Sequence, residues 1–232
     1  ITFAILPVCL MLVAANVALW RLLEHRHWSS LLSLNATVAT ELERRLAAEA
    51  ARIGQLGNQP IVLQSLPRAA APKLPEPKDL DRIGDINEQW ATLLTNDPAV
   101  LETVQTPVSD FFNREIGARP ALRRLVLIKS SGEVLASSDI PTLFDFSPQG
   151  WWRTTCAGNS GSAVSDGLSR KHLFDLNLAI GQSKQAGPLR GVLREELDGT
   201  LLTQNLPVPD GAGETTTMLV GRNPVFAGGS QA

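Results

Sequence analysis

The sequence predicts an α+β protein in which an N-terminal transmembrane helix continues into a long stalk helix, followed by an antiparallel sheet flanked by helices. Three observations predict this order. Residues 1–20 are uncharged and largely apolar, residues 28–56 have helical periodicity, and the strand-like segments follow residue 120. The 232 residues are enough for one membrane segment and one domain with a substantial core.

The composition argues against a nucleic-acid interface and against a metal site. The chain has 21 Lys and Arg and 23 Asp and Glu, and the two signs are mixed along its length. Its two cysteines and three histidines have no metal-ligand spacing, so we expect neither a metal nor another cofactor. Cys9 falls in the predicted membrane segment and therefore cannot pair with Cys156.

Residues 1–20 have the length and composition of a membrane span. Twenty helical residues span roughly 30 Å, the thickness of a bilayer core. Trp20 stands where an interfacial aromatic residue is expected, and Arg21 ends the apolar run. A signal peptide cleaved near Ala15 is the alternative. Residues suited to packing against other membrane helices are Ala14, Ala15, Asn16 and Ala18.

The segment between the span and residue 120 is predicted to be mainly helical. Residues 21–57 form the amphipathic stalk helix, because apolar residues recur there at three- and four-residue steps. Residues 58–120 combine a proline-rich strap with short helices. We expect helices capped by Asp79 and Asp97, and a third that ends near Gly117.

Residues 121–232 are predicted to form the sheet region. Residues 122–129 and 133–137 are strand-like and flank a Ser-Ser-Gly turn. Residues 173–182 alternate apolar and polar side chains, which is typical of a half-buried strand. The remaining elements expected in this region are strands at 162–165, 190–195 and 215–220 and a helix over 196–202.

Three segments carry a resemblance to a known family: the hairpin LVLIKSSGEVLASS from Leu125, the segment FDFSPQGWW from Phe144, and the strand GVLREEL from Gly191. In this order, residues 125–202 resemble the Cache superfamily of extracytoplasmic, PAS-like sensor domains. The resemblance implies a PAS/Cache-like antiparallel sheet after a long helix that emerges from the membrane.

The resemblance also implies a ligand site. One branch of the family binds amino acids through a tyrosine, an arginine, a tryptophan and a second tyrosine. At that spacing this sequence has Phe144, Gln149, Trp151 and Trp152. An arginine places two hydrogen bonds on a ligand carboxylate, whereas Gln149 offers a hydrogen bond without charge. We therefore expect free amino acids to bind weakly.

Two functions are compatible with these features. The resemblance implies the ligand-sensing input of a signalling protein, with a small metabolite bound between sheet and loops. The alternative is a non-catalytic accessory or scaffold subunit of a larger membrane complex, for example a photosynthetic or respiratory assembly, docked through its membrane helix. The altered ligand motif and the lack of a second apolar span favour the alternative. The expected partners are the lipid bilayer and other transmembrane helices or a second copy of the chain.

The sequence also bears on where the domain lies and on whether it is an enzyme. Arg21 and Arg26 favour a cytoplasmic domain by the positive-inside rule. The resemblance favours the opposite, namely a single-pass protein of the inner membrane with a periplasmic domain. Residues 158–161 are similar to the nucleophile loop of trypsin-like proteases, but His172 is the sole histidine beyond the stalk. We therefore expect that the chain is not an enzyme.

Overall fold

The computed structural model describes residues 21, 32–34, 36–67, 75–93, 95–157, 164–168, 173–181, 189–204, 206, 216–220 and 225–229. The expected membrane span, with Ala14, Ala15, Asn16 and Ala18, lies outside these residues, as do residues 158–161 and His172. Within the described parts of the chain, no helix combines the length and the apolarity that crossing a membrane requires.

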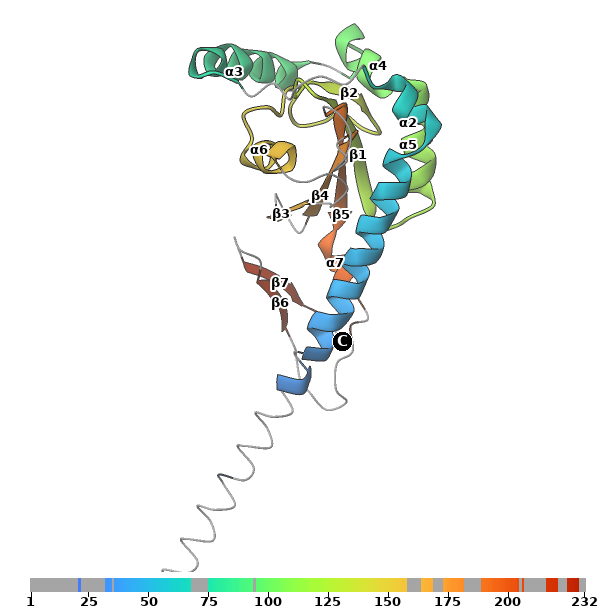
Figure 1. Ribbon diagram of the computed structural model, residues 1–232, viewed down its shortest axis with the longest axis vertical. Coiled ribbons are helices and arrows are strands. Elements are labelled where there is room, and N and C mark those ends of the chain that lie inside the picture. Colours follow the sequence, from blue (N-terminus) through green and yellow to red (C-terminus); the bar gives the residue numbers. More distant parts are fainter. Residues whose placement is uncertain are drawn as a thin grey trace, which may run out of the picture.

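A long N-terminal helix, residues 36–57, runs along one face of the sheet (Figure 1). It is amphipathic as predicted, since Leu42, Ile53 and Leu56 are buried whereas Arg44 is exposed. The helix ends at Gly57, close to the sheet. A Cβ atom at this position would lie 2.9 Å from Cδ2 of Leu178, so only glycine permits this approach without rearrangement.

Four shorter helices follow, and each begins with a proline. The ring fixes φ near its helical value, and the missing N–H would be unpaired in the first turn in any case. The helices are α2 (Pro60–Ser65), α3 (Pro77–Thr92), α4 (Pro98–Val104) and α5 (Pro107–Gly117).

The caps of these helices agree only partly with the sequence prediction. Asp97 caps α4 by accepting a hydrogen bond from the N–H of Ala99 at 2.9 Å, as predicted. The prediction that Asp79 caps α3 is wrong, because the helix begins one turn earlier. Glu76 is the cap, and the Asp79 carboxylate accepts a hydrogen bond from the Glu76 N–H, which completes a capping box. Helix α2 was not predicted.

The sheet is antiparallel, with the strand order β2-β1-β5-β4-β3. Strands β1 and β2 form the predicted hairpin around Gly132, whose φ of 101° favours glycine. A separate pair consists of β6 and β7, of which β7 was not predicted. The strands are β1 (Leu122–Lys129), β2 (Val134–Ser137), β3 (Val164–Leu168), β4 (Leu173–Ile180), β5 (Gly191–Asp198), β6 (Thr216–Val220) and β7 (Val225–Gly229).

The prediction of a helix over residues 196–202 is partly wrong. Strand β5 continues to Asp198, because Glu195 and Glu196 pair with β1 on one side and with β4 on the other. Helix α7 (Gly199–Thr203) begins only after Asp198, whose carboxylate accepts hydrogen bonds from the N–H groups of Thr200 and Leu201. Pairing on both edges has overridden the helical preference of the two glutamates.

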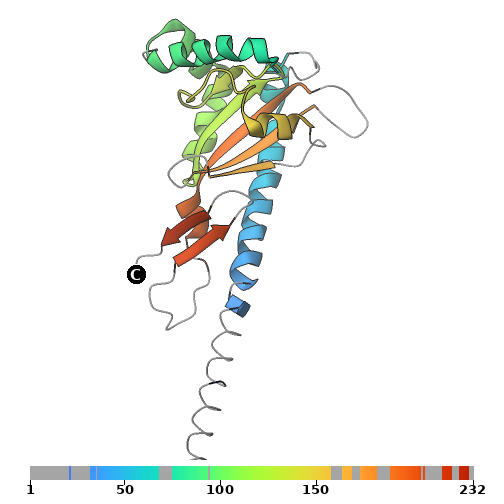
Figure 2. The same ribbon diagram turned by 90° about the vertical axis from the view of Figure 1, so that its left-hand side faces the viewer.

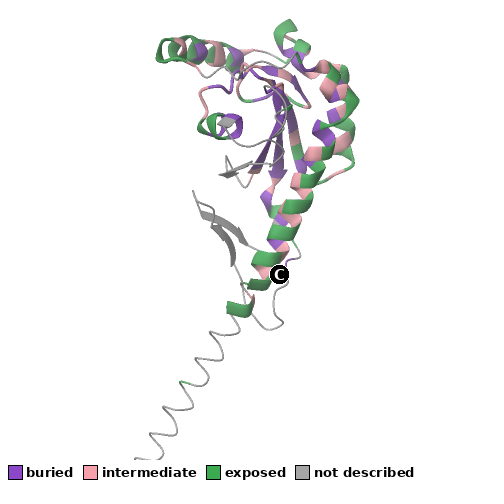
Figure 3. Ribbon diagram, in the orientation of Figure 1, coloured by how far each residue is buried: buried purple, intermediate pink, exposed green. Residues whose placement is uncertain are grey.

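Helices cover both faces of the sheet, and its central strands are buried (Figures 1, 2 and 3). The long helix, α2 and α5 pack on one face against leucines of β1, β4 and β5. Helix α6 (Gly150–Ala157) covers the other face. The prediction that residues 173–182 form a half-buried strand is therefore corrected, because Asp175 and Asn177 of β4 are fully buried.

Candidate functional site

The sheet face beneath α6 carries a set of polar side chains, which we call the Arg194 cluster; all are buried except Arg124, which is partly exposed. Its members come from three adjacent strands: Arg124 of β1, Asp175 and Asn177 of β4, and Arg194 and Glu196 of β5. The strand register places Arg194 opposite Asn177, and Glu196 between Arg124 and Asp175. Residues opposite one another on adjacent strands have their side chains within contact distance. The pairing of these strands thus assembles the cluster.

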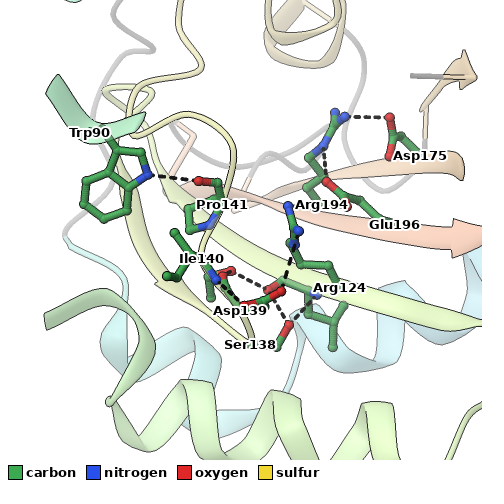
Figure 4. A network of polar contacts seen from close by, with 11 residues as sticks. Trp90, Arg124, Ser138, Asp139, Ile140, Pro141, Asp175, Arg194 and Glu196 are labelled. Carbon is green, nitrogen blue, oxygen red and sulfur yellow. Dashed lines mark hydrogen bonds and ion pairs between the residues drawn. The ribbon is translucent and has the colours of Figure 1, made fainter. Parts of the chain in front are cut away.

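Arg194 contacts both acidic members of the cluster, Asp175 and Glu196 (Figure 4). Its Nη2 donates a hydrogen bond to Oδ2 of Asp175 at 2.6 Å, and its Nη1 donates one to Oδ1 of Asn177 at 3.1 Å. The Arg194 side chain is 6% exposed and that of Asp175 is 0% exposed, so this ion pair is desolvated. The two hydrogen bonds fix the orientation of the guanidinium plane.

Aromatic rings enclose the guanidinium from the side of α6. The Arg194 Cζ atom lies 4.5 Å from the ring centroid of Trp151 and 5.8 Å from that of Phe146. These contacts are cation–π interactions, which strengthen where water is excluded. Trp151 thereby covers the charged centre of the cluster.

Weaker ion pairs connect Arg194 to the rest of the cluster. Nε of Arg194 is 3.9 Å from Oε1 of Glu196, and Nη1 of Arg124 is 3.6 Å from Oε2 of Glu196. Arg124 also lies 3.7 Å from the carboxylate of Asp139. Burial raises the pKa of Glu196, and the opposing attraction of Arg124 is the smaller effect.

Several buried donors in this region have no hydrogen-bond partner among the described residues. They are Nε of Arg124 and Nε of Arg194 on the sheet, and Nε1 of Trp152 and Oγ1 of Thr155 on α6. Buried donors in folded proteins are almost always paired, so a bound molecule is a candidate for the acceptor that these donors lack. A molecule with hydrogen-bond acceptors can supply one.

The structure places the four predicted ligand residues in different environments. Trp151 covers Arg194 as described, and Trp152 is fully buried in the core beneath α6. The ring of Phe144 packs against Trp90 of α3, with centroids 5.1 Å apart. Gln149 precedes α6, and its backbone carbonyl accepts a hydrogen bond from the Trp152 N–H. The guanidinium of the site comes from Arg194 of β5.

The sequence prediction missed the Arg194 cluster. The alternation of charged or amide residues with leucine in β4 and β5 was visible as DLNL and LREEL. Such a pattern is typical of a strand that has one side facing solvent. Only the register of three strands shows that the polar residues meet in the interior. The aromatic cover, by contrast, was among the predicted residues.

The fold and this site define a class. A long helix and α5 cover one face of a five-stranded antiparallel sheet, and α6 lies over a polar cluster on the other. This is an α+β domain in which an antiparallel sheet is flanked by helices, the class that the sequence predicted.

No protein-family model matches the chain, and no curated protein matches it in sequence. Among solved structures, the chain is similar to the sensory domain of the Campylobacter jejuni chemoreceptor Tlp3 with isoleucine bound. The identity is 15%, the TM-score is 0.37, and the match covers 83% of this chain and 74% of that one.

Two further solved structures are similar to the chain. A domain of a sensory box/GGDEF family protein from Vibrio parahaemolyticus matches at 11% identity and a TM-score of 0.37, covering 77% of this chain and 69% of that one. An extracellular ligand-binding receptor from Desulfohalobium retbaense matches at 15% identity and a TM-score of 0.33. That match covers 54% of this chain but spans only 23% of the receptor. At such low TM-scores, these similarities say nothing about what this chain binds.

Proposed function

We propose that this chain is a non-catalytic, ligand-sensing input domain that binds a small polar metabolite at the Arg194 cluster. The observation that carries the proposal is the set of buried donors without a hydrogen-bond partner on α6 and on the sheet beneath it, among the residues that the structure describes. Such a set stabilises the domain less than an apolar core of the same shape would. Its presence is better explained by a bound molecule than by folding.

The chemistry of the cluster indicates the class of ligand. Nε of Arg194 and Nε of Arg124 are donors that suit a carboxylate or another anionic acceptor. Glu196, which lies between the two guanidinium groups, offers an acceptor for a hydroxyl or ammonium group of the same molecule. The Trp151 ring offers an apolar wall. The ligand is therefore a small molecule that carries an acidic group and a second polar group.

The position of Trp151 indicates how binding changes the domain. Because its ring lies on the Arg194 guanidinium, a ligand that reaches this group has to displace the ring. Trp151 and Trp152 belong to α6, so the displacement moves the start of that helix. Binding therefore selects a second arrangement of α6 over the sheet, and this change of arrangement constitutes the signal.

The N-terminal segment supplies the link to the membrane in this proposal. Residues 1–20 serve as an anchor in the inner membrane, and the domain lies in the periplasm. The long helix connects the anchor to the sheet that bears the ligand cluster.

The test is a thermal-shift screen of the detergent-solubilised chain against the amino acids and short mono- and dicarboxylates. A ligand at 100 times its dissociation constant stabilises the protein by about 2.7 kcal/mol. Arg194→Lys keeps the charge but removes the Nε donor and should abolish the shift. Arg123→Lys, at an exposed residue outside the cluster, should retain it. Equal shifts in Arg194→Lys and in wild type would contradict the site, and a panel without any binder would contradict the ligand class.

A further inference from the structure

Glu195 lies between two residues of the Arg194 cluster in β5, but it belongs to the opposite face of the sheet. Its side chain is 0% exposed, and its partners across the sheet are Leu125 of β1 and Leu176 of β4. A carboxylate is thus held among leucines at the centre of the sheet, on the side of the long N-terminal helix.

One guanidinium connects this carboxylate to the long helix. Nη2 of Arg119 lies 2.8 Å from Oε1 of Glu195, and the same nitrogen contacts the carboxylate of Glu49 on the long helix. Arg52, one turn further along, lies 3.6 Å from Glu49. We call these four residues the Glu195 junction. It joins β5, the segment after α5 and the long helix.

We propose that the Glu195 junction is a proton-binding input that is separate from the ligand site. The long helix stays docked on the sheet while Glu195 carries a proton, and it loosens when that proton is lost. The proposal does not rest on ligand binding at the Arg194 cluster, which lies on the other face of the sheet.

The electrostatics of the junction support this direction. The pKa of Glu195 is raised to about 7. Burial is the largest cause, the nearby Glu49 carboxylate also raises the pKa, and the opposing effects of Arg119 and Arg52 do not compensate. The docked arrangement is the one that buries Glu195, so it binds the proton more tightly than an open arrangement does. By linkage, an increase in pH through the neutral range favours opening.

A pocket lies beside the junction, between the long helix and α5. This pocket has a volume of about 460 Å³, and Arg52, Glu115 and Arg119 contribute its charged groups. Arg119 therefore lies between the buried carboxylate and solvent.

A second contact holds the start of the long helix independently of Glu195. Nη1 of Arg45 donates hydrogen bonds to the backbone carbonyls of Leu202 at 2.7 Å and Gln204 at 2.8 Å. Neither partner titrates, so this end of the helix remains attached at all physiological pH values. We therefore expect loosening to be confined to residues 49–57.

Hydrogen exchange of the full chain in detergent at pH 5.5 and 8.5, corrected for intrinsic rates, tests the proposal. In wild type, protection of residues 49–57 should fall about tenfold or more at the higher pH, with a midpoint near neutrality. In Glu195→Gln the protection should be equal at the two values. The control is Glu41→Gln on the same helix, which should behave as wild type because hydrogen bonds from Arg44 and Arg45 lower the pKa of Glu41 to about 2.

Two results would overturn the proposal. One is a wild-type profile without pH dependence in residues 49–57, a measurement that requires no variant to fold. The other is a pH dependence that persists unchanged in Glu195→Gln. If the Gln variant does not fold, Glu195→Leu, which matches the flanking leucines, takes its place.

Discussion

The guanidinium of Arg194 lies 4.5 Å from the ring centroid of Trp151, while its Nη2 is 2.6 Å from the carboxylate of Asp175. A charged group of a central strand is thus held between a carboxylate and an indole ring. Since both charged side chains are buried, their interaction depends on the ring and on α6 to exclude water. The stability of this face of the sheet and its proposed binding function therefore involve the same residues.

Removal of one partner of this pair should strongly destabilise the protein. We expect Arg194→Ala to reduce the free energy of unfolding by about 3–5 kcal/mol, because it leaves the buried Asp175 carboxylate without its guanidinium. Arg123→Ala, which breaks an exposed ion pair with Asp198, should cost less than about 1 kcal/mol. Urea denaturation followed by tryptophan fluorescence measures both. Equal losses of unfolding free energy in the two variants would show that the buried pair contributes no more to stability than the exposed one.

The double substitution Arg194→Met with Asp175→Leu tests the same pair differently. Replacement of both buried charges by apolar side chains of similar size should cost less than Arg194→Ala alone. The same denaturation experiment applies. A double variant less stable than Arg194→Ala would indicate that Asn177 and Glu196 also need the guanidinium.

Glu195 should make the stability depend on pH. The pKa of Glu195 is about 7 in the folded protein, against an ordinary value of 4.5. The folded state therefore binds the proton more tightly, and the resulting stability is fully present below pH 4.5 and lost as the pH rises through 7. We expect a loss on the order of 3 kcal/mol between pH 4.5 and 8, most of it absent in Glu195→Gln. Glu196, whose pKa is also raised, should leave a residual slope in that variant. A Glu195→Gln profile parallel to that of wild type would exclude Glu195 as the source.

Two glycines should respond to alanine in opposite directions. Gly132 has a φ of 101°, and a Cβ atom there would lie 2.5 Å from Cβ of Ser147, so Gly132→Ala should cost about 2 kcal/mol or more. Gly84 lies within α3, where a Cβ atom would meet nothing within 4 Å, and Gly84→Ala should add about 0.5–1 kcal/mol. Thermal unfolding of the two variants should shift the midpoint down and up, respectively. A neutral Gly132→Ala would show that the hairpin tolerates another turn.

The predicted anchor can be tested with residues 1–20 deleted and with the double variant Ala14→Leu/Ala18→Leu. The deletion should move the chain from the membrane fraction to the soluble fraction. The double variant should still insert, because leucine keeps the segment apolar. If the chain is an accessory subunit, wild type should co-purify with other membrane proteins and the double variant should not, since leucine blocks close helix contact. Purification of wild type alone or as a homodimer, established by mass spectrometry, would remove the accessory-subunit alternative.

Local sequence patterns predicted most of the elements, because their causes are local. The hairpin of β1 and β2 follows from two apolar runs around a Ser-Ser-Gly turn, and the start of α4 follows from Asp97 before Pro98. The errors fall where pairing between distant segments competes with local preference. Glu196 was predicted to begin a helix, yet pairing with strands on both sides keeps it extended.

The candidate site shows the same division. The sequence alone named Trp151 and Trp152 as candidate ligand residues, and burial of such large apolar side chains is favourable wherever the chain places them. Only the tertiary structure decided that Arg194 is buried beneath α6 while its neighbour Glu195 is buried beneath the long helix. Successive residues of a strand point to opposite faces of the sheet. The environment of each charged side chain therefore depends on which helix covers its face, and that packing joins residues far apart in the chain.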